Sequence, residues 1–444
     1  METPTVPAAT DRQAPPSEGR PLRFMQIHSF YEQYLAELYG QHPNLAQASH
    51  AAQMQVLRED GFSAVHMLGF HLESLGYESR VVIGNNLPAQ YAWAFENGLA
   101  RGPRRAPSLQ EILLAQIEAF RPDVLYLSHP TTYDSNFVRQ LPRRPRLVLG
   151  WRAANVPPDW DVSEFDVMLS CLAGIRRVAR ERGAKDAIHF YPGFPQFLFE
   201  AVRRASPSHD VCFYGQVNGS LYPSRIRMLN TLTESCLRDG HHLRMHLSGN
   251  LATATPITRA VNLGPAYGLN LYRLIRTSRI TFDVRGTIET SDGAGAVQDL
   301  AGRETANMRL FEATGLGTCL MTEHYDNLTE LFEPGKEIVT YSSERDLTEK
   351  LRHYLAHEDE RQAIAAAGLA RCQRDHSMAA RAREFDAIIR DKLARRDGVP
   401  PVAATRTAAP PPNIERVVAS LERLAAKGAL QETAVAPVLR QAME

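Results

Sequence analysis

The sequence predicts an α/β protein in which two domains, each built on a parallel sheet, face a central cleft. Apolar runs of strand length alternate with helical or polar stretches over most of the chain, which is typical of parallel sheets covered by helices. These runs form two series with a break near residues 195–208. The length of 444 residues suits two or three domains. Because ligands of such sheets bind at the carboxyl ends of the strands, the cleft is the expected site.

The expected strands are six in the first series and five in the second. The first series comprises Phe24–Ile27, Arg80–Ile83, Asp123–Leu127, Leu147–Trp151, Asp166–Ser170 and Ile188–Tyr191. The second series comprises Val211–Tyr214, Leu243–Leu247, Ile280–Val284, Thr318–Met321 and Ile338–Tyr341. The helical stretches that separate them include Ala64–Leu75, Leu109–Phe120, Ser224–Arg238 and Leu269–Arg276.

Composition sets the two ends of the chain apart from its middle. Residues 1–22 are rich in proline and poor in aromatic residues, which predicts a disordered tail. Residues 397–412 contain two proline clusters and are expected to form a stiff linker. Apolar residues at helical spacing in 414–426 predict a helix that docks on a partner or on the protein's own body. The expected units are 1–22, 23–200 and 201–396 (two Rossmann-like domains), 397–412 and 413–444.

Charge and composition exclude several classes of protein. The 50 Lys and Arg residues balance 50 Asp and Glu, so the chain lacks the basic excess of a nucleic-acid-binding protein. No apolar run approaches the roughly 20 residues that cross a bilayer. The five scattered cysteines form no C-x-x-C pair and are expected to be buried, unreactive thiols. Neither an ATP-binding P-loop nor a hydrolase nucleophile elbow occurs.

The segment 307–317 holds the densest set of candidate site residues. It is expected to form a short helix that ends at glycine and whose first turn offers free N–H groups to a phosphate. Arg309 in the first turn would add a forked cation suited to a diphosphate. Glu312, one turn further on, would accept both hydroxyls of a ribose. From spacing alone, a surface helix with ordinary solvated charges remains the alternative.

Five further residues are candidates for a functional role: four lie near the ends of expected strands or in loops and helices that follow them, and the fifth lies late in the chain. Gly215 would allow a ligand close to the backbone, and Arg225 in the next helix would reach a second phosphate oxygen. Tyr267 would lie against a flat base, although each of these three also fits ordinary packing. His129, just after a strand, is expected on the acceptor side of the cleft. His376 is expected to be an interdomain hydrogen-bonding residue.

Three stretches of the second half resemble the carboxyl-terminal half of bacterial GT-B glycosyltransferases. They are "GPAYGLNLYRLIRTSRITFDV", "ANMRLFEATGLGTCLMTEHYDNLTELFEPGKEIVTY" and "LRHYLAHEDERQAIAAAGLARCQRDHS". The resemblance covers residues 210–385 and is greatest to the group 1-like, spore-maturation-protein type. The stretches "GYESRVVIGNN", "YAWAFENG" and "RPDVLYLSHP" are similar to the acceptor-side domain of the same branch.

This resemblance implies a nucleotide-diphosphate-sugar donor on the second domain, an acceptor on the first, and no bound metal or cofactor. The donor-binding positions that it implies are Gly215, Arg225, Tyr267, Asn307, Arg309 and Glu312. Glu304 matches the first glutamate of the retaining-enzyme pair and would touch the donor sugar. The acceptor stays open between a glycan, a lipid-linked glycan, a protein and a small molecule. The expected location is the cytoplasm, with peripheral attachment to the inner membrane as an option.

The expected chemistry is transfer of the sugar as the bond to the diphosphate breaks, with fixed cations stabilising the leaving group. A retaining route, in which the diphosphate itself assists, is favoured. An inverting route would need a base near the acceptor hydroxyl, and His28, His129 and Asp283 are the candidates. Two other readings stay open: a non-catalytic nucleotide-sugar-binding protein, and a sugar-nucleotide epimerase on the same fold.

Overall fold

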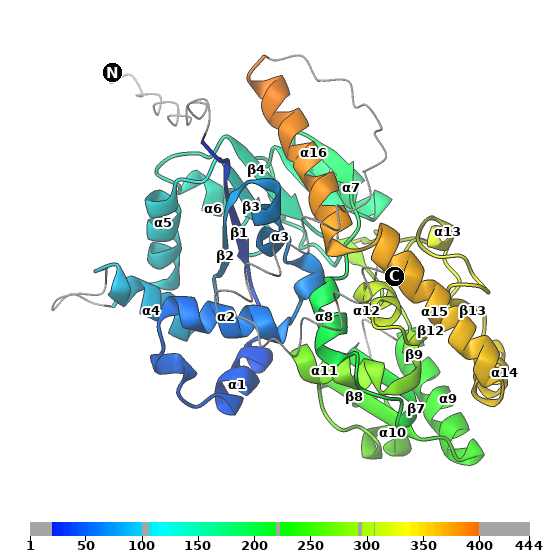
Figure 1. Cartoon of the computed structure of the whole chain (residues 1–444). Helices are drawn as coiled ribbons and strands as arrows, with labels where there is room; N and C mark the ends of the chain where they lie inside the picture. The colour runs from blue at the N-terminus through cyan, green and yellow to red at the C-terminus, as the bar shows by residue number, and fades with distance from the viewer. Residues whose placement is uncertain (1–19, 100–105, 219–222, 292–294, 306, 399–444) are drawn as a thin grey trace, which may run out of the picture. The chain divides into compact units, whose positions relative to one another are not determined.

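Two parallel sheets organise the chain, as the computed structural model shows over residues 20–99, 106–218, 223–291, 295–305 and 307–398 (Figure 1). The first lobe has strand order β2-β1-β3-β4-β5-β6, and the second has β13-β12-β9-β7-β8. Every neighbouring pair in both sheets is parallel. The sequence predicts this arrangement of two Rossmann-like lobes, which is that of a GT-B fold.

All eleven expected strands are present, most of them within two residues of the expected bounds. The first sheet contains β1 Arg23–His28, β2 Glu78–Ile83, β3 Val124–Leu127, β4 Leu147–Trp151, β5 Val167–Ser170 and β6 Ala187–His189. The second contains β7 His209–Asn218, β8 Leu243–Asn250, β9 Ser278–Asp283, β12 Cys319–Glu323 and β13 Val339–Tyr341. A short antiparallel pair, β10 Glu289–Ser291 and β11 Val297–Asp299, has no counterpart among the expected elements.

Helices cover the sheets and connect the strands. Those that precede β7 are α1 Glu32–Gln41, α2 His50–Asp60, α3 Gly69–Leu72, α4 Leu87–Glu96, α5 Leu109–Phe120, α6 Ser135–Arg139, α7 Ala173–Glu181 and α8 Gln196–Val202. Those that follow are α9 Pro223–Asp239, α10 Pro256–Ala260, α11 Gly268–Arg276, α12 Met308–Gly315, α13 Leu328–Leu331, α14 Glu344–Ala356, α15 Glu358–Asp375 and α16 Met378–Arg396. The expected helix Ala64–Leu75 is instead α3 between two short 3-10 turns.

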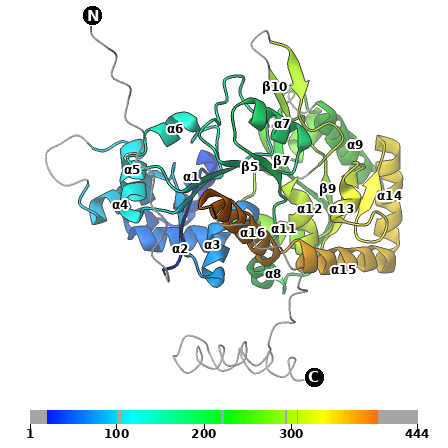
Figure 2. The ribbon, with the colours of Figure 1, turned by 90° about the horizontal axis from the view of Figure 1, so that it is seen from above.

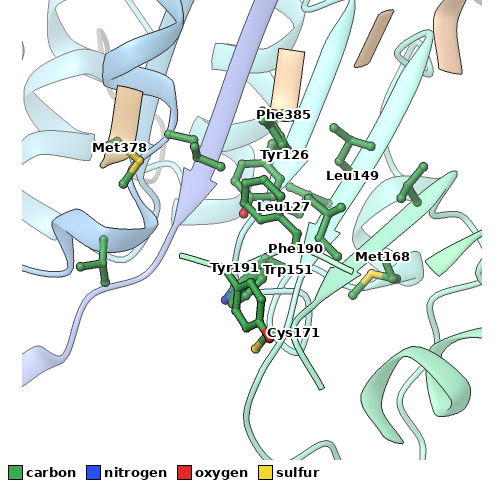
Figure 3. Packing of buried hydrophobic residues seen from close by; sticks show 14 of the residues in the cluster. Tyr126, Leu127, Leu149, Trp151, Met168, Cys171, Phe190, Tyr191, Met378 and Phe385 are labelled. Carbon is green, nitrogen blue, oxygen red and sulfur yellow. The ribbon is translucent and has the colours of Figure 1, made fainter. Parts of the chain in front are cut away.

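The last described helix, α16, returns to the first lobe. It packs against α3 and β4, and both views show it beside α3 (Figures 1 and 2). Phe385 on α16 lies 5.8 Å from Phe24 and 5.1 Å from Tyr126 between ring centroids, within the apolar core of the first sheet (Figure 3). The predicted second domain, 201–396, therefore places its last helix on the first lobe.

The predicted ends of the chain are only partly described. Of the tail 1–22, residues 20–22 are described, and there Arg20 pairs with the buried Asp123 at 2.9 Å. The predicted linker 397–412 and the tail 413–444 lie outside the described residues beyond Gly398. No described helix is both long and apolar enough to span a membrane.

All five cysteines are buried and none forms a disulfide, as predicted. Burial raises the pKa of the Cys171 thiol to about 12, and the same holds for the thiols of Cys236, Cys319 and Cys372. At neutral pH these thiols stay protonated, so they pack as small apolar groups and are not reactive nucleophiles.

His376 joins the elements that meet between α15 and α16. Its Nε2 lies 2.7 Å from the Leu331 carbonyl oxygen, and its Nδ1 lies 2.7 Å from Nη2 of Arg381. Since a carbonyl only accepts and a guanidinium only donates, the imidazole is neutral with its proton on Nε2. The His376 carbonyl also accepts from the N–H of Phe194, in the segment between the two sheets. These bonds agree with the predicted interdomain role.

The neutral His376 predicts a loss of stability in acid. Burial is the main cause that lowers its pKa to about 4, so below about pH 6.5 the unfolded chain binds a proton that the folded protein does not. Stability from this group is complete above pH 6.5 and falls by up to about 1.4 kcal/mol per pH unit toward pH 4. Urea unfolding of wild type and His376→Gln at pH 7.5, 6 and 5 measures this. The variant is expected to show a shallower pH dependence, and equal slopes would contradict the assignment.

Candidate functional site

A cavity of about 580 Å³ lies where the carboxyl ends of the strands of both sheets meet. In each sheet it sits at the point where strand order reverses, which is where ligands bind in open α/β sheets. In the first sheet that point lies between β1 and β3, and His28 and His129 line the cavity there. In the second it lies between β7 and β9, which supply Gly215 and the residues around Arg285. The expected cleft is therefore present.

Arg309 lines the cavity, but its guanidinium is held by the protein. Its Nη1 pairs with Asp283 Oδ1 at 3.0 Å, and its Nε and Nη2 donate to the Tyr214 carbonyl at 2.9 and 2.6 Å. The guanidinium also lies over the rings of Phe213 and Tyr214. Only 6% of the residue is exposed. The expectation of a forked cation open to a diphosphate is thus corrected: most of this charge is neutralised by Asp283.

Gly215 makes that clamp possible. Its φ is +144°, and a Cβ added there would lie 2.1 Å from Nη2 of Arg309. Any side chain would therefore displace the guanidinium from β7. Gly215 lines the cavity as predicted, yet the close approach that it permits in this structure is that of Arg309.

Arg225, in the first turn of α9, also lines the cavity and is buried. Its Nε donates to the Val284 carbonyl at 3.0 Å, and its Nη1 donates to the Gln216 carbonyl at 2.6 Å. These two carbonyls follow β9 and lie on β7, so Arg225 ties together the two strands that flank the second reversal point. It places a cation beside the cavity while its Nε and Nη1 brace the wall.

The start of α12 faces the cavity. Asn307 is the N-cap, and both it and Met308 line the cavity. The Asn307 amide donates to Asp283 Oδ1 at 2.5 Å, which fixes the entry of the chain into the helix. The first-turn N–H groups of a helix lack intrahelical partners and carry a partial positive charge. The predicted anion seat is therefore oriented toward the cavity.

Glu312 is the one carboxylate among the described residues that line the cavity. Its Oε2 accepts the Tyr214 hydroxyl proton at 2.8 Å, and the structure shows no partner for Oε1 within the described ranges. Burial raises the pKa of Glu312, against the hydrogen bond from Tyr214 and the charge of Arg309. One oxygen thus remains available to a ligand hydroxyl.

Two predicted catalytic residues do not line the cavity, and both predictions are corrected. Asp283, the last residue of β9, is fully buried, and Arg309, Asn307 and Thr322 surround its carboxylate. No acceptor hydroxyl reaches it. Glu304 Oε2 instead accepts the N–H of Ala173 at 2.7 Å. That N–H opens α7 of the first lobe and has no intrahelical partner, so Glu304 caps a helix across the two lobes.

Tyr267 precedes α11 and lines the cavity from the second lobe. Its ring meets Phe62 and Tyr34 of the first lobe edge-on, with centroids 5.5 and 5.8 Å apart. Its hydroxyl donates to Gln33 Oε1 at 3.3 Å. The tyrosine therefore contacts the facing lobe, and stacking against a base stays a prediction.

Three imidazoles line the first-lobe wall. His28 and His129 have ring centroids 6.3 Å apart, and His28 Nδ1 lies 3.0 Å from Ser128 Oγ. Burial lowers the pKa of His28 well below its usual value, and the neighbouring histidines add to this. Burial likewise lowers the pKa of His66 to about 4 and lowers the pKa of His129. At neutral pH these rings are uncharged hydrogen-bonding groups, and His129 lies in the cavity as predicted.

Comparison with known families bears on the second lobe. Residues 196–387 match a family model described as "Glycosyl transferase-like". The matched residues make up most of the second lobe, which therefore resembles a glycosyl transferase-like domain. This match agrees with the predicted enzyme class, a glycosyltransferase, whereas the spore-maturation-protein type stays a prediction. No curated protein matches the chain significantly.

Solved structures resemble the chain only distantly. Sucrose-phosphate synthase from Thermosynechococcus elongatus is 11% identical, with 84% of this chain and 100% of that chain covered and a TM-score of 0.49. A glycosyltransferase from Rickettsia africae is 9% identical, with 84% and 99% covered and a TM-score of 0.49. A putative UDP-N-acetylglucosamine 2-epimerase from Listeria monocytogenes is 12% identical, with 84% and 97% covered and a TM-score of 0.43. These values are too low to carry a donor or an acceptor across.

The glycosyl transferase-like lobe and its partner lobe also bring residues to the cavity that the sequence did not single out. Arg285 and Arg152 each follow a predicted strand by one residue, and both line the cavity. Arg285 donates to the carbonyls of Gly302, at 2.8 Å, and Glu304. A charged residue directly after a buried parallel strand was the available signal. His66 gave no such signal, because its segment was expected to be one continuous helix.

Proposed function

We propose that the protein transfers a sugar from a nucleotide-diphosphate-sugar donor, held by the glycosyl transferase-like lobe, to an acceptor held by the first lobe. The observation that carries this proposal is the charge of the shared cavity. Four arginines and a helix N-terminus line it against a single carboxylate among the described residues, which suits an anionic ligand.

The donor fits the second-lobe wall in a definite order. The diphosphate lies between the α12 N-terminus and Arg285, whose guanidinium forms no ion pair with a described carboxylate. Arg225 and Arg309 lie behind the diphosphate and contribute the positive potential of partly neutralised cations. Glu312 Oε1 accepts the ribose hydroxyls, and Tyr267 flanks the base. As the anomeric bond breaks, these fixed donors stabilise the charge that develops on the leaving diphosphate.

We further propose that transfer needs no metal and retains the anomeric configuration. Protein cations supply positive charge at the diphosphate, and the described residues include no cluster of three metal-ligating side chains. The described first-lobe wall has no carboxylate that could act as a base for inversion, whereas His28 and His129, the histidine candidates for such a base, do lie on it. In the retaining route, the diphosphate oxygen accepts the proton of the acceptor hydroxyl as the sugar moves.

Turnover tests this function. Wild type is expected to release nucleoside diphosphate slowly from one of the UDP-, TDP- or GDP-sugars, faster with an acceptor, and equally in EDTA. Arg285→Gln is expected to lower the rate about 100-fold, because one charge-stabilising donor is lost. Arg303→Gln, at an exposed arginine that pairs with Asp326, is the matched control.

The same assay separates the other readings. A binding protein would be stabilised by the nucleotide and release nothing, and an epimerase would change the sugar without acceptor or free diphosphate. Either outcome, or equal rates in Arg285→Gln and Arg303→Gln, contradicts the proposal. Product with inverted configuration would overturn the retaining route alone.

A further inference from the structure

Arg152 is the one formally charged side chain on the described first-lobe wall of the cavity. It directly follows β4, at the carboxyl edge of the first sheet. The histidines on this wall are uncharged at neutral pH, because burial lowers their pKa values. Nothing else on this wall therefore repels or neutralises an anion.

Among the described residues, carbonyls hold the guanidinium of Arg152 in place and no carboxylate does. Its Nε donates to the carbonyls of Ala154 and Asn155 at 3.2 and 3.0 Å, and its Nη2 also donates to Asn155. Within the described residues it forms no ion pair, and its Nη1 has no acceptor. Arg309 across the cavity differs, since Asp283 neutralises it.

A half-buried arginine without a counter-ion is costly, because the charge loses water and gains no opposite charge. Burial accordingly lowers the pKa of Arg152 to about 10. The loop is nonetheless fixed: the Arg152 N–H donates to the Leu169 carbonyl, and Asn155 Oδ1 accepts the Glu289 N–H at 2.9 Å. Such a preorganised cation with two free N–H donors matches the geometry of a phosphate or carboxylate.

We propose that Arg152 binds an anionic group of the acceptor, a phosphate or a carboxylate, at a subsite on the first-lobe wall. The assignment of this anion to the acceptor rests on the proposed function, whereas the anion subsite itself rests on the contacts of Arg152. His129 lies next to this guanidinium, whose charge contributes to its low pKa, and His28 lies beyond it. An acceptor anchored at Arg152 therefore sets its neighbouring hydroxyl groups beside neutral imidazoles.

Binding of two simple probes tests the subsite. Inorganic phosphate and acetate are titrated calorimetrically into wild type, Arg152→Gln, Arg152→Lys and the surface control Arg177→Gln, with and without saturating nucleoside diphosphate. At least one of the two probes is expected to bind wild type and Arg177→Gln with the same affinity. Its affinity for Arg152→Gln is expected to be at least 10-fold weaker, and its affinity for Arg152→Lys to lie between these values. The tighter of the two probes identifies the acceptor anion as phosphate or carboxylate. Circular dichroism and melting temperature establish that each variant is folded.

The nucleoside-diphosphate melting shift separates this inference from the proposed function. It is expected to be the same in wild type and Arg152→Gln. Equal probe affinity in wild type and Arg152→Gln, or no probe binding to wild type, would overturn the subsite. Loss of the nucleotide shift in Arg152→Gln alone would also overturn it, by placing Arg152 on the donor diphosphate. Absence of the shift in wild type would count against the proposed function and leave the probe result standing.

Discussion

Arg309→Met is expected to destabilise the protein by about 3–5 kcal/mol, because it removes the cation from a buried ion pair and leaves Asp283 charged and enclosed. Nε and Nη2 of Arg309 also hold the Tyr214 carbonyl, which would lose both donors. Urea unfolding followed by circular dichroism measures the shift in midpoint. The substitution therefore acts mainly on folding, and its direct effect on donor binding is limited to the loss of one partly neutralised charge behind the diphosphate.

The double variant Arg309→Met with Asp283→Asn is the control for this interpretation. It removes both charges, so a substantial part of the lost stability is expected to return. A free energy of unfolding for Arg309→Met within about 0.5 kcal/mol of the wild-type value, which is the range of ordinary surface substitutions, would contradict the buried-pair assignment.

Glu312→Gln is expected to weaken nucleoside-diphosphate binding by about 10- to 100-fold, because hydrogen bonds to a charged group are worth about 1.5–3 kcal/mol. Glutamine keeps an acceptor for the Tyr214 hydroxyl, so the fold is expected to survive. Glu330→Gln is a control that changes the same kind of hydrogen bond at an exposed position. Glu330 Oε2 accepts the Tyr191 hydroxyl at 2.9 Å, much as Glu312 Oε2 accepts that of Tyr214 at 2.8 Å, but Glu330 does not line the cavity.

The strands were predictable because a parallel strand buried on both faces is a continuous apolar run, as in Leu147–Trp151, whose predicted bounds match β4. The helix 308–315 was predictable for a similar local reason, since a capping residue, Asn307, precedes a short helical pattern and a left-handed glycine, Gly317, follows it. The segment 64–75 was harder, since its apolar residues also fit short turns packed on the sheet.

The partners of the charged residues were not predictable, because they come from distant segments. The sequence predicts Arg309 to be a free cation, whereas in the structure it pairs with Asp283 at the end of β9. Glu304 looked like a donor-site residue, but the start of α7 supplies an N–H from the other lobe. Gly215 was recognised as a place of close approach, although the approaching group is a side chain of the protein itself. The role of Arg152 was not predictable, because what sets this residue apart is that no described carboxylate pairs with it, and the sequence does not show this.

The deciding experiment is calorimetric titration of UDP, TDP and GDP into wild type, Glu312→Gln and Glu330→Gln. If the interlobe cavity holds the donor as proposed, one diphosphate binds wild type and Glu330→Gln with the same affinity and Glu312→Gln at least 10-fold more weakly. Binding of none of the three to wild type, or the same affinity in all three proteins, would show that this cavity wall is not where a nucleotide is recognised.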